Sequence, residues 1–288
     1  MKWVRGLGIV FLIVLVVFTV HIYTRTADGI GNFRTDLEFA ARTDVRADGT
    51  VDIYNVRDFM YASGTVLSKN WIATTTVRSD EIVRAWFFVE PFPLSPLFAH
   101  TFVSFEFTDG SALAFSIEAR IEEGDHYSIT RGMLNEYEIA LQWGYERDFL
   151  ARRVLFLDND VHMYPLAIGS TSAKQLFVAL AKETQRVYES PRFYHTLFEN
   201  CTNLIASVVN SHAPQTLPFD FAWYLTGNAD RYLVKHNFIQ IPSENTFASY
   251  REQVNLQNFR TIIEQNATSS YSDFSAQLRM GFTQISEK

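Results

Sequence analysis

The chain has 288 residues, of which 47% are hydrophobic and 15% aromatic, which is enough for one domain with a sizeable core. Acidic and basic residues are mixed along the chain and give a formal charge of −7, which argues against a nucleic-acid partner. A single cysteine excludes an internal disulfide, so this thiol is either an inert buried side chain or a reactive group.

The N-terminal segment predicts a membrane anchor at residues 1–23. Residues 6–23, "GLGIVFLIVLVVFTVHIY", carry no formal charge, and Lys2 and Arg5 precede them. Such a run nearly spans a bilayer, and its positive flank belongs in the cytoplasm, so the rest of the chain is expected on the far side. A cleaved signal peptide is the alternative, although the residues that follow offer no small-x-small cleavage site.

The remaining chain divides into three predicted parts. Residues 24–60 form a linker and lead-in, residues 61–242 form the main domain, and residues 243–288 form a polar, peripheral C-terminal tail. At the start of the main domain, β-branched and aromatic residues predict a buried strand at 82–89. The three prolines that follow predict a loop at 90–98.

Residues 99–120, "AHTFVSFEFTDGSALAFSIEAR", predict a β-hairpin around an Asp-Gly turn. The alternating faces of the two strands coincide only when even positions pair with even positions. This register requires a three-residue loop with Gly110 in the left-handed conformation. His100 then lies opposite Glu118, and Ser116 shares their face.

A strand near "YEIALQWGY" and a short charged helix at "ERDFLARR" are predicted next, followed by three longer helices. Residues 172–188 combine an apolar stripe with a capping box formed by Ser172 and Gln175. The second helix is expected at about residues 199–210 and the third at residues 221–237.

The second helix carries the only cysteine, in the stretch "FENCTNLI". Cys201 begins an apolar stripe at i, i+3, i+4 and i+7, together with Leu204, Ile205 and Val208. The thiol is therefore expected on the inward face of the first turn, where the partial positive charge of a helix start lowers the pKa of a thiol. Free N–H groups at such a start can also hold an oxyanion, and we expect Asn200 and Thr202 to support this role.

A thiol nucleophile needs a histidine that takes its proton and a third group that orients the histidine. Among seven histidines, His100 has the most suitable context, because it occupies a strand position that faces Glu118. We expect Cys201, His100 and Glu118 to form this group; Ser116 or Ser104 would replace Glu118 if the register slipped. No metal-ligand spacing, glycine-rich phosphate loop or "GXSXG" motif occurs, so no metal and no cofactor is expected.

The order of a strand histidine, a polar residue on the next strand and an "NC" pair that opens a helix resembles the circularly permuted papain-like superfamily. A closer resemblance is to the periplasmic domain of the bacterial lipoprotein N-acyltransferase Lnb family. It is carried by the hairpin quoted above and by "YEIALQWGYERD", "VHMYPL", "PRFYHTLFENCTNLI" and "YSDFSAQLR". These segments lie in the expected order and cover about residues 99–279.

The resemblance implies an α+β fold: a circularly permuted papain-like domain, with an antiparallel sheet packed on the cysteine-bearing helix. In this chain the domain is expected to follow the one N-terminal transmembrane helix predicted above. It implies Cys201 as the acyl-accepting nucleophile and His100 as its base. Tyr194 and His195, in a "YHTL" segment where relatives often have "YNTL", are expected to line the site.

Three functions remain open at this point. The favoured one is a thiol acyltransferase anchored in the bacterial inner membrane by a single span, with its domain in the periplasm. It would take acyl groups from phospholipids or lipoproteins through a Cys thioester and pass them to an amine such as a lipoprotein N-terminus. The second is a periplasmic cysteine amidase or peptidase on envelope peptides, in which water replaces the amine. The third is a non-catalytic envelope scaffold in which Cys201 is merely buried.

Overall fold

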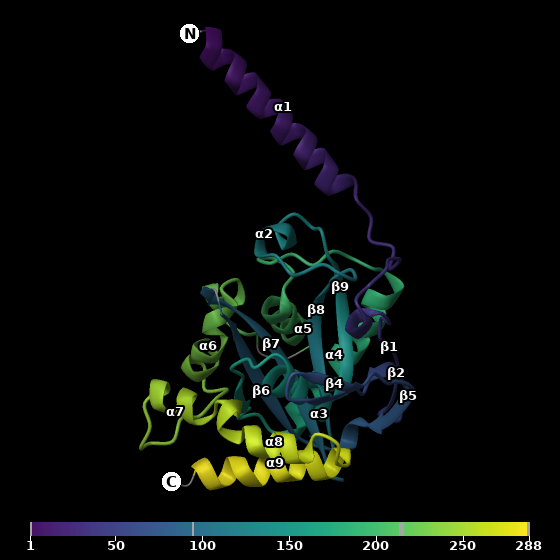
Figure 1. Ribbon diagram of the computed structural model, residues 1–288, viewed down its shortest axis with the longest axis vertical. Helices are drawn as coiled ribbons and strands as arrows, with labels where there is room; N and C mark the ends of the chain where they lie inside the picture. The colour runs from purple at the N-terminus through teal and green to yellow at the C-terminus, as the bar shows by residue number, and fades with distance from the viewer. Residues whose placement is uncertain (1, 94, 213–215, 287–288) are drawn as a thin grey trace.

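The computed structural model describes residues 2–93, 95–212 and 216–286, and Figure 1 shows a central sheet with helices packed around it. The strands are β1 (Arg42–Val45), β2 (Thr50–Arg57), β3 (Met60–Ala62), β4 (Thr65–Ser68), β5 (Trp71–Arg78), β6 (Ile82–Phe92), β7 (Ser95–Phe107), β8 (Ala112–Arg120), β9 (Glu138–Tyr145) and β10 (His162–Pro165). Eight of them form one sheet in the order β1-β2-β9-β8-β7-β6-β10, with β5 paired to β2, while β3 and β4 form a separate pair.

The α-helices are α1 (Lys2–Thr24), α2 (Ile129–Gly132), α3 (Glu146–Ala151), α4 (Ser170–Glu189), α5 (Cys201–His212), α6 (Ala229–Lys235), α7 (Phe247–Gln253), α8 (Arg260–Asn266) and α9 (Tyr271–Ser286). A π-helical turn, η3 (Arg152–Phe156), continues α3, and short 3-10 turns, among them η4 (Phe221–Trp223) and η5 (Thr226–Asn228), join α5 to α6. The predicted α+β class is therefore confirmed.

The two faces of β7 pack against different helices, because side chains alternate along a strand. On the odd-numbered face, Phe105 packs edge-on against Phe177 of α4, with ring centroids 5.1 Å apart. On the even-numbered face, the Ser104 hydroxyl donates to Glu146 of α3 at 2.6 Å. The sheet thus lies between a layer that contains α4 and α5 and a layer that contains α3 and α9.

The residues predicted as a membrane anchor form most of α1, which extends away from the rest of the molecule in Figure 1. The helix is confirmed, but within the described part of the chain no helix is long and apolar enough to cross a membrane. A transmembrane span at residues 6–23 is therefore not supported. Several side chains of the predicted anchor lie outside the described ones, namely those of residues 1–5, Leu7, His21 and Tyr23.

The hairpin register is confirmed. Phe102 pairs with Ser116 and Ser104 with Ala114, so even positions face even positions. The loop holds three residues between Phe107 and Ser111, and Gly110 has a φ of 81°, in the left-handed region that a side chain with a Cβ rarely adopts.

The predicted loop at 90–98 is wrong, since β6 continues to Phe92 and β7 starts at Ser95. Pro91 pairs with Ala99 across the two strands. The proline is tolerated because β10 pairs with β6 only as far as Val89, so that among the described residues no strand pairs with the other edge of β6 at Pro91.

Two of the predicted helices also differ from the observed ones. The capping box of Ser172 and Gln175 does not start α4, because this helix begins at Ser170 with Gly169 as its N-cap. The helix predicted at residues 221–237 is only partly present: η4 and η5 precede α6, which starts at Ala229.

The segments on either side of the predicted main domain also contribute to the folded body. Strands β1 and β2 belong to the same sheet as the hairpin. In the C-terminal segment Ile263, Phe274 and Leu278 are buried in the core. The predicted division at residues 60 and 242 stays a prediction.

Candidate active site

The start of α5 is fixed by a reciprocal pair of asparagines. The Asn200 side-chain oxygen accepts the N–H groups of Thr202 and Asn203, each at 2.9 Å. The Asn203 side-chain oxygen in turn accepts the Asn200 N–H at 2.8 Å. This arrangement is an N-cap, and it places Cys201 as the first residue of the helix.

The cap bears directly on the predicted oxyanion support. The N–H of Thr202 is already bonded to Asn200, so it is not free for an oxyanion. The Thr202 hydroxyl lies 2.9 Å from the Thr101 hydroxyl and joins α5 to β7. The cap leaves the N–H of Cys201 itself as the donor next to the sulfur.

The Cys201 thiol lies where β7 and β8 separate. The pairing of the two strands ends at Phe102 and Ser116, and one residue further along β7 the Thr101 N–H donates to the Cys201 Sγ at 3.4 Å. The side chain is 2% exposed, and the predicted inward stripe of α5 is buried with it. The thiol is thus held against the sheet at the end of a strand pair.

His100 contacts its predicted partners. Its Nε2 lies 2.8 Å from the Ser116 hydroxyl and 3.2 Å from a Glu118 carboxylate oxygen, and the Ser116 hydroxyl donates to the same oxygen at 2.7 Å. Because Nε2 is engaged there, Nδ1 is the ring nitrogen left for the hydrogen bond between His100 and Cys201. The structure therefore brings Cys201, His100, Ser116 and Glu118 into one chain of contacts.

The electrostatics of this chain favour a thiolate-imidazolium pair. Burial opposes the charged form of His100, but the Glu118 carboxylate and the hydrogen bond to Cys201 outweigh it and raise the pKa of His100 to about 10. Burial likewise opposes the thiolate, yet the His100 ring and the Thr101 N–H lower the pKa of Cys201. His100 and Arg153 hold the pKa of Glu118 well below its usual range, in spite of burial.

The sequence reasoning missed two charged residues beside this group. Arg153 of η3 donates to Glu118 at 3.3 Å and to Glu90 at 2.8 Å, and its side chain is 2% exposed. Glu90 pairs directly with His100 across β6 and β7. A lone glutamate at the end of the apolar run "IVRAWFFVE" was the available signal, since a buried carboxylate needs a cation.

The two predicted lining residues have different surroundings. Tyr194 is buried; burial and the neighbouring Cys201 raise the pKa of its phenol well above the usual range. It also hydrogen-bonds to Tyr127, which the sequence reasoning did not single out. His195 instead supports the loop before α5, where its Nδ1 accepts the N–H groups of Leu197 and Phe198.

The strand end that carries His100 is held by the segment before α6. The Ala99 N–H donates to the Thr226 hydroxyl at 2.8 Å, and this hydroxyl donates back to the Ala99 carbonyl at 2.6 Å. Gly227 lies so close to the backbone of Pro96 and Leu97 that a Cβ at this position would clash. This close approach keeps the start of β7 in place beside Cys201.

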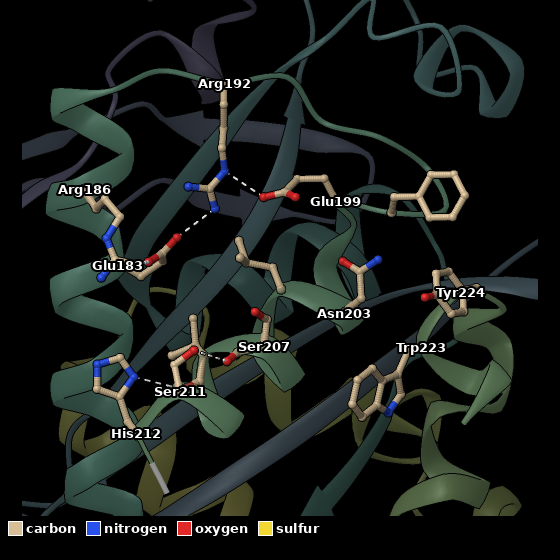
Figure 2. Close-up of a pocket in the computed structure, with 13 residues that line it drawn as sticks. Glu183, Arg186, Arg192, Glu199, Asn203, Ser207, Ser211, His212, Trp223 and Tyr224 are labelled. Atoms are coloured by element: carbon tan, nitrogen blue, oxygen red, sulfur yellow. Dashed lines mark hydrogen bonds and ion pairs between the residues drawn. The ribbon is translucent and has the colours of Figure 1, made fainter. Parts of the chain in front are cut away.

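A pocket of about 390 Å³ lies along α5, next to α4 and η4, as Figure 2 shows. Arg192 forms its charged side and pairs with Glu183 of α4 and with Glu199, both at 2.7 Å. Aromatic side chains line another part, from Phe198, Trp223 and Tyr224. Cys201 does not line this pocket, although Leu204 and Val208 of the same helix do.

Residues 68–227 match the family model described as the Lnb N-terminal periplasmic domain. This span is more than half of the chain and contains Cys201, His100 and Glu118. No curated protein sequence and no solved structure matches the chain.

Proposed function

Because the chain belongs to the family of the Lnb N-terminal periplasmic domain, we propose that it is a periplasmic thiol acyltransferase that works through a thioester on Cys201. The observation that carries this proposal is the chain of contacts from Cys201 through His100 to Glu118. A buried thiol with a lowered pKa, beside a histidine held by a carboxylate, is the arrangement that activates a sulfur nucleophile.

In the first step, the Cys201 thiolate attacks the carbonyl carbon of an acyl ester. A C–S bond forms, and the tetrahedral intermediate collapses as the C–O bond to the alcohol breaks. The imidazolium of His100 gives its proton to the leaving alkoxide, which departs as an alcohol. Glu118 stays ionised throughout and keeps the ring in position.

In the second step, an amine attacks the thioester carbonyl. Neutral His100 takes the proton of the amine, the C–S bond breaks, and the thiolate returns with an amide as the product. A lipoprotein N-terminus is the acceptor that the proposal favours. Water in place of the amine would make the chain a hydrolase.

The oxyanion of each tetrahedral intermediate needs hydrogen-bond donors that stabilise its negative charge. The Cys201 N–H is suited to this role because Cys201 is the first residue of α5. The partial positive charge at the start of the helix further stabilises an oxyanion there. Asn200 acts indirectly: its side chain occupies the next two N–H groups and fixes the direction of the helix.

Attachment to a membrane through α1 is part of the proposal. The large apolar side chains from Ile9 to Val20 are between 41% and 70% exposed. An apolar surface of this extent is typical of a segment that contacts a membrane or another protein. Attachment would hold the thiol near lipid esters and raise their effective concentration. The test is whether the chain stays with vesicles after an alkaline wash and whether a variant without residues 2–24 is released.

Intact-mass spectrometry after incubation with bacterial membranes tests the acyltransferase directly. We expect an adduct of fatty-acyl mass on Cys201 that hydroxylamine removes, since hydroxylamine cleaves thioesters. Cys201→Ala should carry no adduct, and Cys201→Ser, which puts a hydroxyl in place of the thiol, serves as the matched control.

The same experiment separates the other functions. An adduct that forms only with envelope peptides would replace the acyltransferase by an amidase or peptidase. A fully folded chain that forms no adduct with either source, and whose Cys201→Ala variant is functionally equivalent, would leave only a scaffold.

A further inference from the structure

His100 lies in a row of three charged strand positions. Glu118 on β8 contacts its ring, and Glu90 on β6 pairs with His100 directly across the strands. Two carboxylates therefore flank one imidazole at the end of the sheet. Their like charges would repel each other in a buried site unless a cation lies between them.

Arg153 supplies this cation. Its Nε donates to Glu90 at 2.8 Å, one terminal nitrogen donates to Glu118 at 3.3 Å, and the other donates to the Phe149 carbonyl at 3.1 Å. The second oxygen of Glu90 accepts from Asn159 at 2.5 Å. Every nitrogen of the guanidinium thus has a partner, and two of these partners are the carboxylates beside His100.

The position of Arg153 is closely fixed. Its guanidinium carbon lies 4.4 Å from the centre of the Phe102 ring and 5.3 Å from that of Phe149. Phe102 also stacks beside His100. Arg153 belongs to the π-helical turn η3, and such turns are rare and frequently occur at functional sites.

We propose that Arg153 and Glu90 are positioning residues that set the charge balance of the Cys201 and His100 pair through Glu118. This inference rests on the proposed function and adds two residues to its site. Arg153 fixes Glu118 in its place against His100 and supplies a positive charge that favours the thiolate. The negative charge of Glu90 partly cancels the positive charge of Arg153 and so limits how strongly Arg153 favours the Cys201 thiolate.

The charged and titratable groups around His100 come from every element packed against it. They are Glu118 on β8, Glu90 on β6, Arg153 on η3, Cys201 on α5 and Tyr194 in the loop before α5. Arg34 acts on Glu118 at longer range. Among these groups, Arg153 is the cation that contacts both glutamates.

Electrostatics predicts opposite effects for the two residues. Loss of a positive charge raises the pKa of every nearby group, and loss of a negative charge lowers it. Arg153→Met should therefore shift the formation of the Cys201 thiolate to higher pH, and Glu90→Gln should shift it to lower pH. A unit charge about 10 Å from the thiol, at an effective dielectric constant of about 20, gives a shift of roughly one pH unit.

The experiment measures alkylation of the full chain by iodoacetamide as a function of pH, with intact mass as the readout. Cys201 is the only cysteine, so the added mass reports this thiol alone. Arg153→Lys keeps the charge and should restore the midpoint to within a few tenths of a unit. Arg147→Met is the matched control, because Arg147 is also a buried arginine paired with a carboxylate, Asp58.

Shifts of opposite sign for Arg153→Met and Glu90→Gln, with the midpoint of Arg147→Met unchanged, support the inference. Unchanged midpoints, or shifts of the same sign, overturn it. If Arg153→Met does not fold, Glu90→Gln decides alone, since a lower midpoint supports the inference and an unchanged one overturns it. A wild-type midpoint at the ordinary value of a thiol would instead contradict the proposed function, so the two failures are distinguishable.

Discussion

Arg153 and Arg192 each bridge two glutamates, Arg153 beside the candidate thiol and Arg192 in the pocket along α5. Arg192 makes the shorter contacts, 2.7 Å to both Glu183 and Glu199. Arg153 makes contacts of 2.8 and 3.3 Å. Their burial differs more than their distances, because the side chain of Arg153 is 2% exposed and that of Arg192 is 31% exposed.

The difference shows that burial, rather than distance, decides what such a bridge does. Water and salt screen the pair of Arg192 with the 33% exposed Glu199, and the buried Glu183 has a second cation in Arg186, so Arg192 is expected to contribute little to stability. The field of Arg153 is screened much less, so it reaches the groups that titrate beside it. The following predictions test this contrast, beginning with the largest effect.

Removal of the thiol is expected to have the largest effect. Cys201→Ala should abolish the acyl adduct and any turnover, because no bond to the substrate can form. The free energy of unfolding should change by only about 1 kcal/mol, since a small side chain replaces another small one. Chemical denaturation beside the mass measurement checks both parts, and a variant that retains turnover would exclude the thioester mechanism.

Removal of the base should have the next largest effect. His100→Gln keeps a polar side chain of similar size but cannot accept the proton, so turnover should fall by about 10²–10⁴-fold. The alkylation midpoint of Cys201 should rise toward the ordinary value of a thiol, near 9. An unchanged midpoint would show that His100 does not act on the sulfur.

The two bridges can be compared directly by their stability. Arg153→Met leaves the buried Glu90 and the partly exposed Glu118 without their shared cation and should lower the free energy of unfolding by about 3–5 kcal/mol. Arg192→Met should lower it by about 1 kcal/mol or less. Urea denaturation of both variants measures the contrast, and equal losses would contradict the role assigned to burial.

The ion pair of His100 and Glu118 beside Arg153 makes the stability of the fold depend on pH. The pKa of His100 is raised from 6.5 to about 10, so its ion pair stabilises the fold fully below about pH 6.5 and loses this effect as the pH rises through about 10. The pKa of Glu118 is lowered, so its contribution is present above about pH 4.5 and is lost as the pH falls further. The stability difference between wild type and His100→Gln should therefore be largest near pH 5–6.5 and should vanish above pH 10.

An effect on stability alone is expected at the helix cap. Asn200→Ala removes the acceptor for two N–H groups of α5 and should cost about 1–2 kcal/mol of stability. Asn200→Asp keeps an acceptor and serves as the control. If Asn200→Ala is as stable as wild type, the cap does not determine where α5 starts.

Local patterns predicted the parts of the site that depend on local geometry. The alternation of two strands fixed the hairpin register, and so the contact of His100 with Glu118. The helical spacing of Cys201 placed it on the buried face of α5. Both predictions rest on the periodicity of side chains along one helix or one strand, which can be read from the sequence of that segment alone.

Other features depend on distant partners and could not be predicted in this way. The "ERDFLARR" segment is charged in sequence but largely buried in the fold, and Arg153 contacts Glu90, which lies 63 positions earlier in the chain. Likewise, β6 can continue through Pro91 only because β10 pairs with it no further than Val89, which the sequence of β6 does not reveal. The start of α5 moved from residue 199 to Cys201 because Asn200 caps it.

The pH dependence of Cys201 alkylation in the wild-type chain tests the central claim most directly. We expect an alkylation midpoint clearly below pH 9, the ordinary pKa of a thiol, because His100 and the Thr101 N–H stabilise the thiolate. A midpoint at or above 9 would mean that burial dominates and that Cys201 is an inert core residue, which would contradict the account.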